Sequence, residues 1–203
     1  MIQIEGLWWP DDVGEKWRHA FKHVKALEAS IALCAQHRTA VQAGGNIGLW
    51  PRRMADVFTQ VFTFEPEPLS YECLIRNVPE RVMCTGIALG AEYGRCGIER
   101  RSLGSHQVVL DNDSVTVAPL DWLALHDLDL LQLDIEGYEW HALFGAEETI
   151  RRCRPIIHLE LRDFTAQYGS SDAEVRALLD GWGYREVTQL PGNDVVFQHR
   201  EAA

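Results

Sequence analysis

The sequence lacks cysteine pairs and a signal-peptide pattern. Its five cysteines are scattered and form no C-x-x-C motif: Cys34, Cys73, Cys84, Cys96 and Cys153. An odd, scattered set is typical of free thiols in a reducing compartment, rather than of a disulfide framework or a zinc site. The first residues, MIQIEGLWWPDD, have neither the basic nor the apolar region of a secretory signal. We therefore expect a cytoplasmic protein.

Positive charge and long apolar runs are scarce as well. Lysine and arginine number 19 against 30 aspartates and glutamates, which gives a formal net charge of −11. A domain that holds nucleic acid through its overall charge would be basic, so we do not expect a nucleic-acid partner. No apolar run approaches the ~18 residues of a membrane-spanning helix, which argues against a membrane partner. The 203 residues do have 46% hydrophobic content, enough to bury a core without disulfides.

The pattern divides the chain into a helical N-terminal extension at 1–38 and an alternating region at 39–203. In the extension, apolar residues recur every three or four positions, which indicates an amphipathic helix. They are Val13, Trp17, Phe21, Val24, Leu27 and Ile31. The simpler interpretation is an outer helix packed on a sheet. The alternative is a helix that covers a pocket, with Trp8 and Trp9 near its ligand.

From residue 39 the pattern alternates between strand and helix. Strands are predicted at 39–43, 60–64 and 81–89, with helices at 50–58 and 69–78 between them. Alternation at this spacing is typical of a parallel, doubly wound sheet. The sequence therefore predicts an α/β fold with helices on both faces of the sheet.

A polar, glycine-containing stretch at 91–113 interrupts this rhythm, and we interpret it as a long loop or small hairpin. The segment at 128–136 is almost continuously apolar, as expected of a strand buried on both faces. Further elements follow from the same patterns: strands at 114–120 and 155–161, a short helix around 121–125, helical structure through 153, a helix that Ser171 and Asp172 cap, and a closing antiparallel hairpin at 184–190 and 194–199.

A glycine-rich turn follows the strand at 39–43. Gly44, Gly45 and Gly48 let the backbone turn sharply and approach a ligand closely. Their G-G-x-x-G spacing differs from the G-x-G-x-x-G of dinucleotide-binding proteins, which makes a nicotinamide dehydrogenase the least favoured enzyme. Glu65 ends the next strand, where an acid can accept hydrogen bonds from both ribose hydroxyls. Together they predict a nucleoside site, although a structural turn and a solvated acid are the simpler alternative.

Acidic residues also end the fourth and fifth core strands. Asp134 and Glu136 are two positions apart, so both lie on the same side of an extended backbone. Such a pair can share a metal, or one carboxylate can act as a base with a raised pKa. His158 and Glu160 end the next strand with the same spacing. For His158 alone we favour a satisfied polar group over a catalytic one.

Four segments together resemble the FkbM family of S-adenosylmethionine-dependent methyltransferases. The family reads V-D-x-G-A-N-I-G, then F-E-P, then K-I-D-V-E-G, then a strand that ends in an acid. The matching stretches here are VQAGGNIG (41–48), FEPEP (64–68), LDIEGYE (133–139) and HLEL (158–161). The resemblance covers roughly residues 39–199, and the four motifs fall in order on the expected strands.

The resemblance implies a Rossmann-like class I methyltransferase fold, with a seven-stranded, mostly parallel sheet whose last strand is antiparallel. It also implies S-adenosylmethionine as cofactor and O-methylation of a hydroxyl on a sugar, glycan or small metabolite. The implied cofactor contacts are Gln42, Gly44, Gly45, Asn46 and Gly48 in the turn, Glu65 at the ribose, Ile87 and Ala88 near the adenine, and Asp134 beside the methionine end or the acceptor.

The chain departs from the family at Gln42, where the family usually has aspartate. In those enzymes the acid helps to position the amino-acid end of the cofactor. Glutamine keeps the hydrogen bonding but loses the charge, so weaker cofactor binding or a rearranged contact is expected. Gly45 stands in place of the more common alanine, which is a smaller change.

An alcohol acceptor must lose a proton during methyl transfer, which favours a nearby base or a metal. We expect Asp134, Glu136 and Glu160 to form an acidic cluster that faces the acceptor. His158 and His141 are weaker candidates for the base, and a divalent metal is a further candidate cofactor.

Acceptor choice is expected to depend on the N-terminal helix and the 91–113 segment, since specificity usually lies on loops above a scaffold. Arg95, Arg100 and Arg101 suit an anionic acceptor, or simply line a solvated loop. Two alternative functions stay open at this point. One is methylation of nucleic acid or a modified nucleotide, and the other is a catalytically silent cofactor-binding module, with Gln42 as the warning sign.

Overall fold

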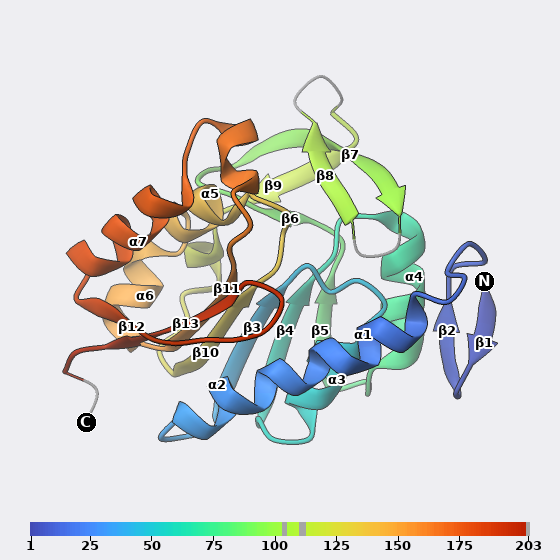
Figure 1. Ribbon diagram of the computed structural model, residues 1–203, viewed down its shortest axis with the longest axis horizontal. Helices are drawn as coiled ribbons and strands as arrows, with labels where there is room; N and C mark the ends of the chain where they lie inside the picture. Colours follow the sequence, from blue (N-terminus) through green and yellow to red (C-terminus); the bar gives the residue numbers. More distant parts are fainter. Residues whose placement is uncertain (103–104, 110–112, 202–203) are drawn as a thin grey trace.

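Five short apolar strands run parallel to one another at the centre of the computed structural model, which describes residues 1–102, 105–109 and 113–201 (Figure 1). In spatial order they are β11 (Ile156–Glu160), β10 (Leu128–Leu133), β3 (Thr39–Ala43), β4 (Gln60–Phe64) and β5 (Val82–Thr85). β13 (Asp194–His199) pairs antiparallel with β11, and β12 (Tyr184–Gln189) pairs antiparallel with β13, which completes seven strands. The predicted α/β class with a largely parallel sheet is confirmed.

The strand order changes direction between β3 and β10. From β3 the chain moves outward through β4 and β5, then returns to the other side of β3 to form β10 and β11. In open α/β sheets, ligands bind at the carboxyl ends of the strands beside such a switch point. The turns that follow β3 and β10 are therefore where the topology places a site.

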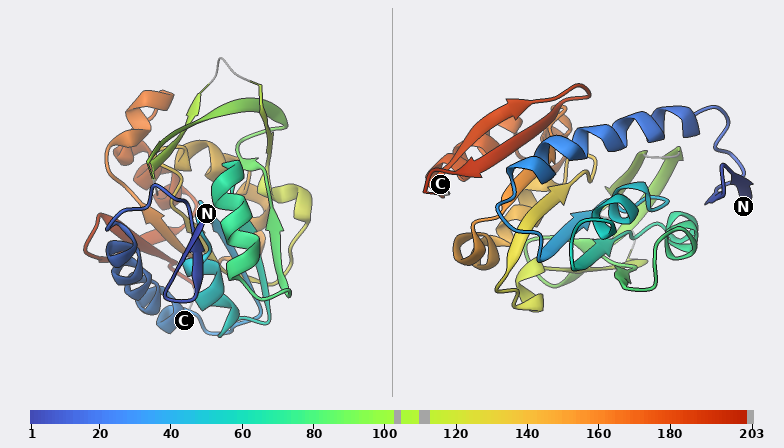
Figure 2. Two further views of the ribbon diagram at one scale, coloured as in Figure 1. Left: turned by 90° about the vertical axis from the view of Figure 1, so that its right-hand side faces the viewer. Right: turned by 90° about the horizontal axis from the view of Figure 1, so that it is seen from below.

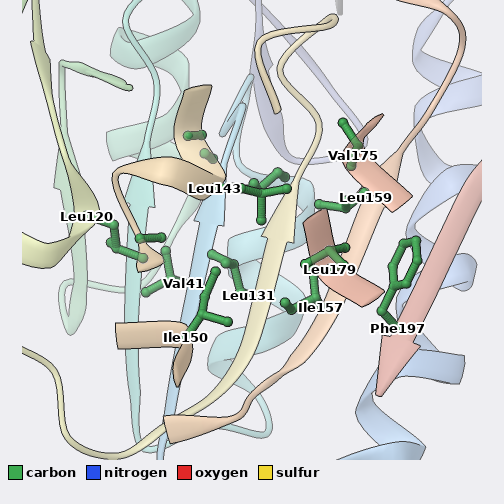
Figure 3. Close-up of a cluster of buried hydrophobic side chains, with 14 of the residues drawn as sticks. Val41, Leu120, Leu131, Leu143, Ile150, Ile157, Leu159, Val175, Leu179 and Phe197 are labelled. Carbon is green, nitrogen blue, oxygen red and sulfur yellow. The ribbon is translucent and has the colours of Figure 1, made fainter. Parts of the chain in front are cut away.

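Helices cover both faces of this sheet (Figure 1). On one face lie α5 (Glu139–Phe144), α6 (Glu147–Cys153) and α7 (Asp172–Gly181), and on the other α2 (Leu27–Leu33) and α3 (Leu49–Ala55). Figure 3 shows the larger core cluster, in which Leu131 and Ile157 of the strands meet Leu143, Ile150 and Leu179 of the helices. The side chain of Ser171 caps α7 by accepting from the Glu174 amide, as the sequence predicts.

The predicted strand at 81–89 is two strands in the structure. β5 ends at Thr85, and β6 (Ala88–Leu89) leaves the main sheet to pair with β9 (Val115–Ala118). β7 (Gly94–Ser102) and β8 (Ser105–Val109) complete a second, four-stranded sheet of order β6-β9-β7-β8. Of the two structures expected for 91–113, the hairpin is the one formed. The apolar pattern did not reveal the split, because both pieces are apolar.

The N-terminal region contains a hairpin that the helical pattern missed. β1 (Ile2–Ile4) and β2 (Leu7–Trp9) pair through a turn in which Glu5 and Gly6 both have positive φ angles, as a two-residue hairpin loop requires. After it come α1 (Trp17–His23), the 3-10 turn η1 (Val24–Ala26) and α2 in one nearly continuous line (Figure 2). The division of the chain at residue 38 stays a prediction.

Shorter elements connect these layers: α4 (Pro68–Asn77), η2 (Leu120–Leu123) and η3 (Phe164–Tyr168). β2 is fixed to the end of α4, because the Trp8 amide donates to Asn77 Oδ1 at 2.7 Å and Asn77 Nδ2 donates to the Trp8 carbonyl at 2.8 Å. Within the described ranges, no helix is both long and apolar enough to cross a membrane.

Candidate functional site

The glycine turn after β3 brings the ends of β3 and β10 into close contact. Gly44 has a φ of +82°, and a Cβ placed there would lie 1.8 Å from the Asp134 carbonyl oxygen. Only glycine fits at this position. The amides of Gly44 and Gly45 both donate to the Phe64 carbonyl, at 3.0 and 2.9 Å, which ties the turn to the end of β4. Gly48, with a φ of +96°, then begins α3.

The carboxylate of Glu65 lies directly beside this turn. Its oxygens accept from the amides of Asn46 at 2.7 Å and Glu67 at 2.8 Å. Because the side chain is buried, the pKa of Glu65 is raised to about 7. Asn46 has a left-handed backbone, with a φ of 46°, and its buried Oδ1 has no hydrogen-bond donor among the described residues. The site thus holds one buried acid and one buried, unused acceptor.

A narrow pocket of about 70 Å³ opens at these residues, and we call it pocket 1. Its walls come from the ends of β3 and β4, from Ile87 and Ala88, and from the turn after β10. Ile98 and Val108 of the β7–β8 hairpin complete it. The predicted contacts Gly44, Asn46, Glu65, Ile87, Ala88 and Asp134 all line this pocket. It has one polar side, at Glu65, and one apolar side, at Ile87.

The structure brings the three predicted acids together at the ends of β10 and β11. Carboxylate oxygens of Asp134, Glu136 and Glu160 lie within 4.8 Å of one another. Arg162 forms an ion pair with Glu160. Burial, and then the neighbouring Asp134 carboxylate, raise the pKa of Glu160, while Arg162 lowers it. A hydrogen bond also joins the Glu160 and Asp134 carboxyl groups.

Three oxygen donors at this spacing are of the type that a divalent cation takes. Here the positive charge beside them belongs to Arg162, which already pairs with Glu160. Metal binding at this cluster stays a prediction.

A second and wider pocket of about 390 Å³, pocket 2, lies on the other side of the same turn. It shares Gly44, Asn46, Asp134 and Glu136 with pocket 1 and includes Gly45. Its outer wall is α1, together with the Lys16 that precedes it, and Trp9 and Trp50 also line it. This geometry favours the interpretation that the N-terminal helix covers a pocket.

Three pocket-2 residues of the N-terminal helix escaped the sequence reasoning. Lys16, His19 and His23 all line the pocket. The available signal was their spacing, because positions i, i+3 and i+7 share one face of a helix. The apolar stripe on the other face of the helix predicts packing and gives no information about this polar face.

Three predicted site residues line neither pocket: Gly48, Gln42 and His158. Gln42 is buried in the sheet, where its Oε1 accepts from Thr63 Oγ1 at 2.6 Å and its Nε2 donates to the Ala43 carbonyl at 3.1 Å. His158 is fully buried, with Nδ1 2.7 Å from Ser30 Oγ and Nε2 3.2 Å from Asp194 Oδ1. The structure thus places His158 in the core, with Nδ1 hydrogen-bonded to Ser30 and the buried Nε2 without a hydrogen-bond partner among the described residues.

His141 and Arg95 also line neither pocket. His141 stacks on Tyr138 with ring centroids 4.4 Å apart, and burial lowers its pKa. Arg95 Nε donates to the Asp113 carbonyl at 2.7 Å. The side chains of Arg100 and Arg101 are not among those described.

Comparison with known proteins places this geometry in a family. A family model described as the methyltransferase FkbM domain matches residues 42–186. A search of the curated proteins finds no match. The matched residues include the strand ends at both pockets and most of the sheet. The family match therefore covers the same residues as the sequence motifs and the site.

Solved structures share the fold at low sequence identity. The methyltransferase FkbM of Methylobacillus flagellatus KT is 17% identical with a TM-score of 0.55, over 81% of this chain and 44% of its own, so this chain spans less than half of that protein. The N-methyltransferase NodS of Bradyrhizobium japonicum WM9, in complex with S-adenosyl-L-homocysteine, is 11% identical with a TM-score of 0.54 and covers 95% and 94%. The magnesium protoporphyrin IX methyltransferase of Synechocystis PCC 6803, with bound SAM, is 9% identical with a TM-score of 0.51 and covers 91% and 79%. Together with the matched domain, the fold and the motifs lead to one conclusion: the chain belongs to the FkbM methyltransferase family.

Proposed function

We propose that this chain transfers a methyl group from S-adenosylmethionine to a hydroxyl on a sugar, glycan or small metabolite. The observation that carries the proposal is the position of Glu65 beside the glycine turn, on the wall of pocket 1. Two structural neighbours hold S-adenosylmethionine or its product, which supports the choice of cofactor.

The residues of pocket 1 fit this cofactor in four respects. Gly44 leaves backbone space that any Cβ would fill. Each oxygen of an ionised carboxylate accepts more than one hydrogen bond, so Glu65 can bind ribose hydroxyls while keeping its backbone partners. Asn46 Oδ1, buried and without a donor, can accept from the cofactor's amino group. Ile87 provides an apolar wall for the adenine.

The bound cofactor supplies an electrophilic methyl group on a sulfonium. The chain must align the acceptor hydroxyl and remove its proton. We assign both tasks to Asp134, and its presence on the walls of pocket 1 and pocket 2 supports this choice. In this proposal Glu160, which is hydrogen-bonded to Asp134 and paired with Arg162, orients the base. Glu136 lies on the same shared wall.

The sequence alone left open a catalytically silent binding module, because this chain has Gln42 where the family has an aspartate. The Gln42 amide is occupied by Thr63 and the Ala43 carbonyl, away from both pockets. Loss of charge at this position therefore removes no contact from the pocket wall, which supports an active enzyme over a silent one.

The test is a product search with a methyl-labelled cofactor and fractionated host metabolites. The expected product carries the label on oxygen. Removing a general base costs about 10²–10⁴-fold in rate, so Asp134→Asn should lower turnover at least a hundredfold, and Glu136→Gln should lower it as well.

Cofactor affinity, measured by calorimetry, separates the chemistry from binding in these variants. Asp56→Asn is the matched control, because Asp56 is exposed and lines neither pocket. Full turnover in both Asp134→Asn and Glu136→Gln would remove the assigned base, and label on nitrogen or carbon would contradict O-methylation.

A further inference from the structure

Pocket 2 has walls of opposite charge. Its inner wall, at the ends of β10 and β11, carries Asp134, Glu136 and Glu160. Its outer wall, on the N-terminal helix, carries Lys16, His19 and His23. In a chain with a net charge of −11, a group of basic side chains directed at one pocket is a marked local exception.

Lys16 is the side chain of the outer wall that is always charged at neutral pH. Within the described ranges, Lys16 makes no ion pair, and Arg162 already pairs with Glu160. Burial raises the pKa of Asp134, and His23 across the pocket offsets a small part of that rise. Lys16, one turn earlier on the same face as His19, is exposed and lines the space between the walls.

Helix geometry leaves room for a ligand between these side chains. Ala20 lies on the same face, between His19 and His23, and also lines the pocket. Its small side chain keeps the middle of the wall open, while Trp17 and Phe21 of the same helix pack against the core.

We propose that pocket 2 binds the methyl acceptor and that this acceptor carries an anionic group, a phosphate or a carboxylate. The anion contacts Lys16 and the two histidines, and the hydroxyl to be methylated reaches Asp134 on the wall shared with pocket 1. This inference rests on the proposed methyl transfer. A cationic group at the outer wall meets repulsion at Lys16, and a neutral group there gains nothing from its charge.

The test is a titration of the protein, saturated with S-adenosylhomocysteine, with three matched probes. Glucose 6-phosphate carries a phosphate, glucuronate a carboxylate, and glucose neither. We expect saturable binding of at least one anion and at least tenfold weaker binding of glucose. Lys16→Gln should weaken anion binding about tenfold, because it removes a charge-assisted hydrogen bond, and leave glucose unaffected.

Lys22→Gln is the matched control, since it makes the same substitution on the same helix at an exposed residue outside the pocket. Equal losses in Lys16→Gln and Lys22→Gln, equal binding of glucose and the anions, or no binding of any probe would each overturn the inference. Thermal unfolding of both variants verifies that they are folded.

The two proposals can fail separately. If S-adenosylhomocysteine does not bind, the proposed function is wrong, and the same titration of the ligand-free protein still tests the anion site. If S-adenosylhomocysteine binds and Lys16→Gln behaves as the control does, only the anionic acceptor is wrong.

Discussion

Gly44 is the residue whose chemical identity the structure restricts most tightly. Because Gly44 has no side chain, the backbone that follows β3 can contact the Asp134 carbonyl. The glycine turn therefore lies directly beside the acidic cluster. The sequence shows a glycine there, but not what lies opposite. This contact depends on the register of β3 on β10, two strands that are far apart in sequence. A local sequence pattern does not contain that register.

We predict that Gly44→Ala lowers the free energy of unfolding by about 3 kcal/mol or more, because it combines overpacking with a positive φ. The measurement is urea denaturation. The matched control is Gly181→Ala, at the end of α7, where a Cβ meets nothing within 4 Å. Similar midpoints for the two variants would contradict the close approach of β3 and β10.

Glu139 gives a pH-dependent prediction at the same scale. Its Oε1 accepts from the Ile135 amide at 3.0 Å, its Oε2 has no donor among the described residues, and burial raises its pKa from 4.5 to about 8. Between these two pH values the folded state binds a proton that the unfolded state releases. This group's contribution to stability therefore falls as pH rises from about 4.5 to 8.

The variant Glu139→Gln keeps the size of the protonated side chain and removes its titration. Its stability relative to the wild type should increase from pH 5 to pH 8, as measured by chemical denaturation at each pH. Glu147→Gln, at a half-exposed residue of α6, is the control. A stability difference that does not change with pH would show that Glu139 titrates normally.

At the scale of elements, a buried hydrogen bond joins the N-terminal helix to the sheet. Ser30 of α2 meets His158 of β11, and both side chains are fully buried. This contact explains why a histidine beside the site lines no pocket. Its role is to hold α2, and through it α1, over the carboxyl ends of the strands.

We predict that Ser30→Ala lowers the free energy of unfolding by about 1–3 kcal/mol, the cost of leaving a buried group unpaired, without changing methyl transfer in the folded protein. His158→Asn tests the same assignment from the other side. If folded His158→Asn lost turnover as Asp134→Asn does, His158 would be a catalytic base after all.

The elements of the main sheet were predictable because their patterns are local. β3, β4, β12 and β13 match their predicted ranges within a residue, since turn residues bound each apolar run. The site acids were predictable for a related reason: Asp134 and Glu160 end parallel strands, and such ends meet at one edge of a sheet.

What escaped prediction depends on contacts that are distant in sequence. β6 leaves the main sheet because β9 offers it a partner. Gln42 leaves the site because Thr63, on the neighbouring strand, takes its amide oxygen. Lys16 belongs to the site only because α1 lies across the end of the sheet, a placement that helical periodicity does not determine.

At the scale of the whole molecule, the two pockets meet where the strand order reverses. The glycine turn and the acidic turn come from the two central strands, β3 and β10, so four residues form the wall between the pockets. One pocket is enclosed by the β7–β8 hairpin and the other by the N-terminal helix. The fold thus separates a proposed cofactor side from a proposed acceptor side, with Asp134 between them.

The central claim is that pocket 1 binds S-adenosylmethionine through Glu65. Its most direct test is calorimetric titration of the protein with S-adenosylmethionine, repeated with Glu65→Gln and with the control Glu72→Gln, at an exposed ion pair of α4. We predict saturable one-to-one binding, at least tenfold weaker in Glu65→Gln because charged hydrogen bonds are lost, and unchanged in Glu72→Gln. No binding to the wild type, or equal affinity in Glu65→Gln, would contradict the account.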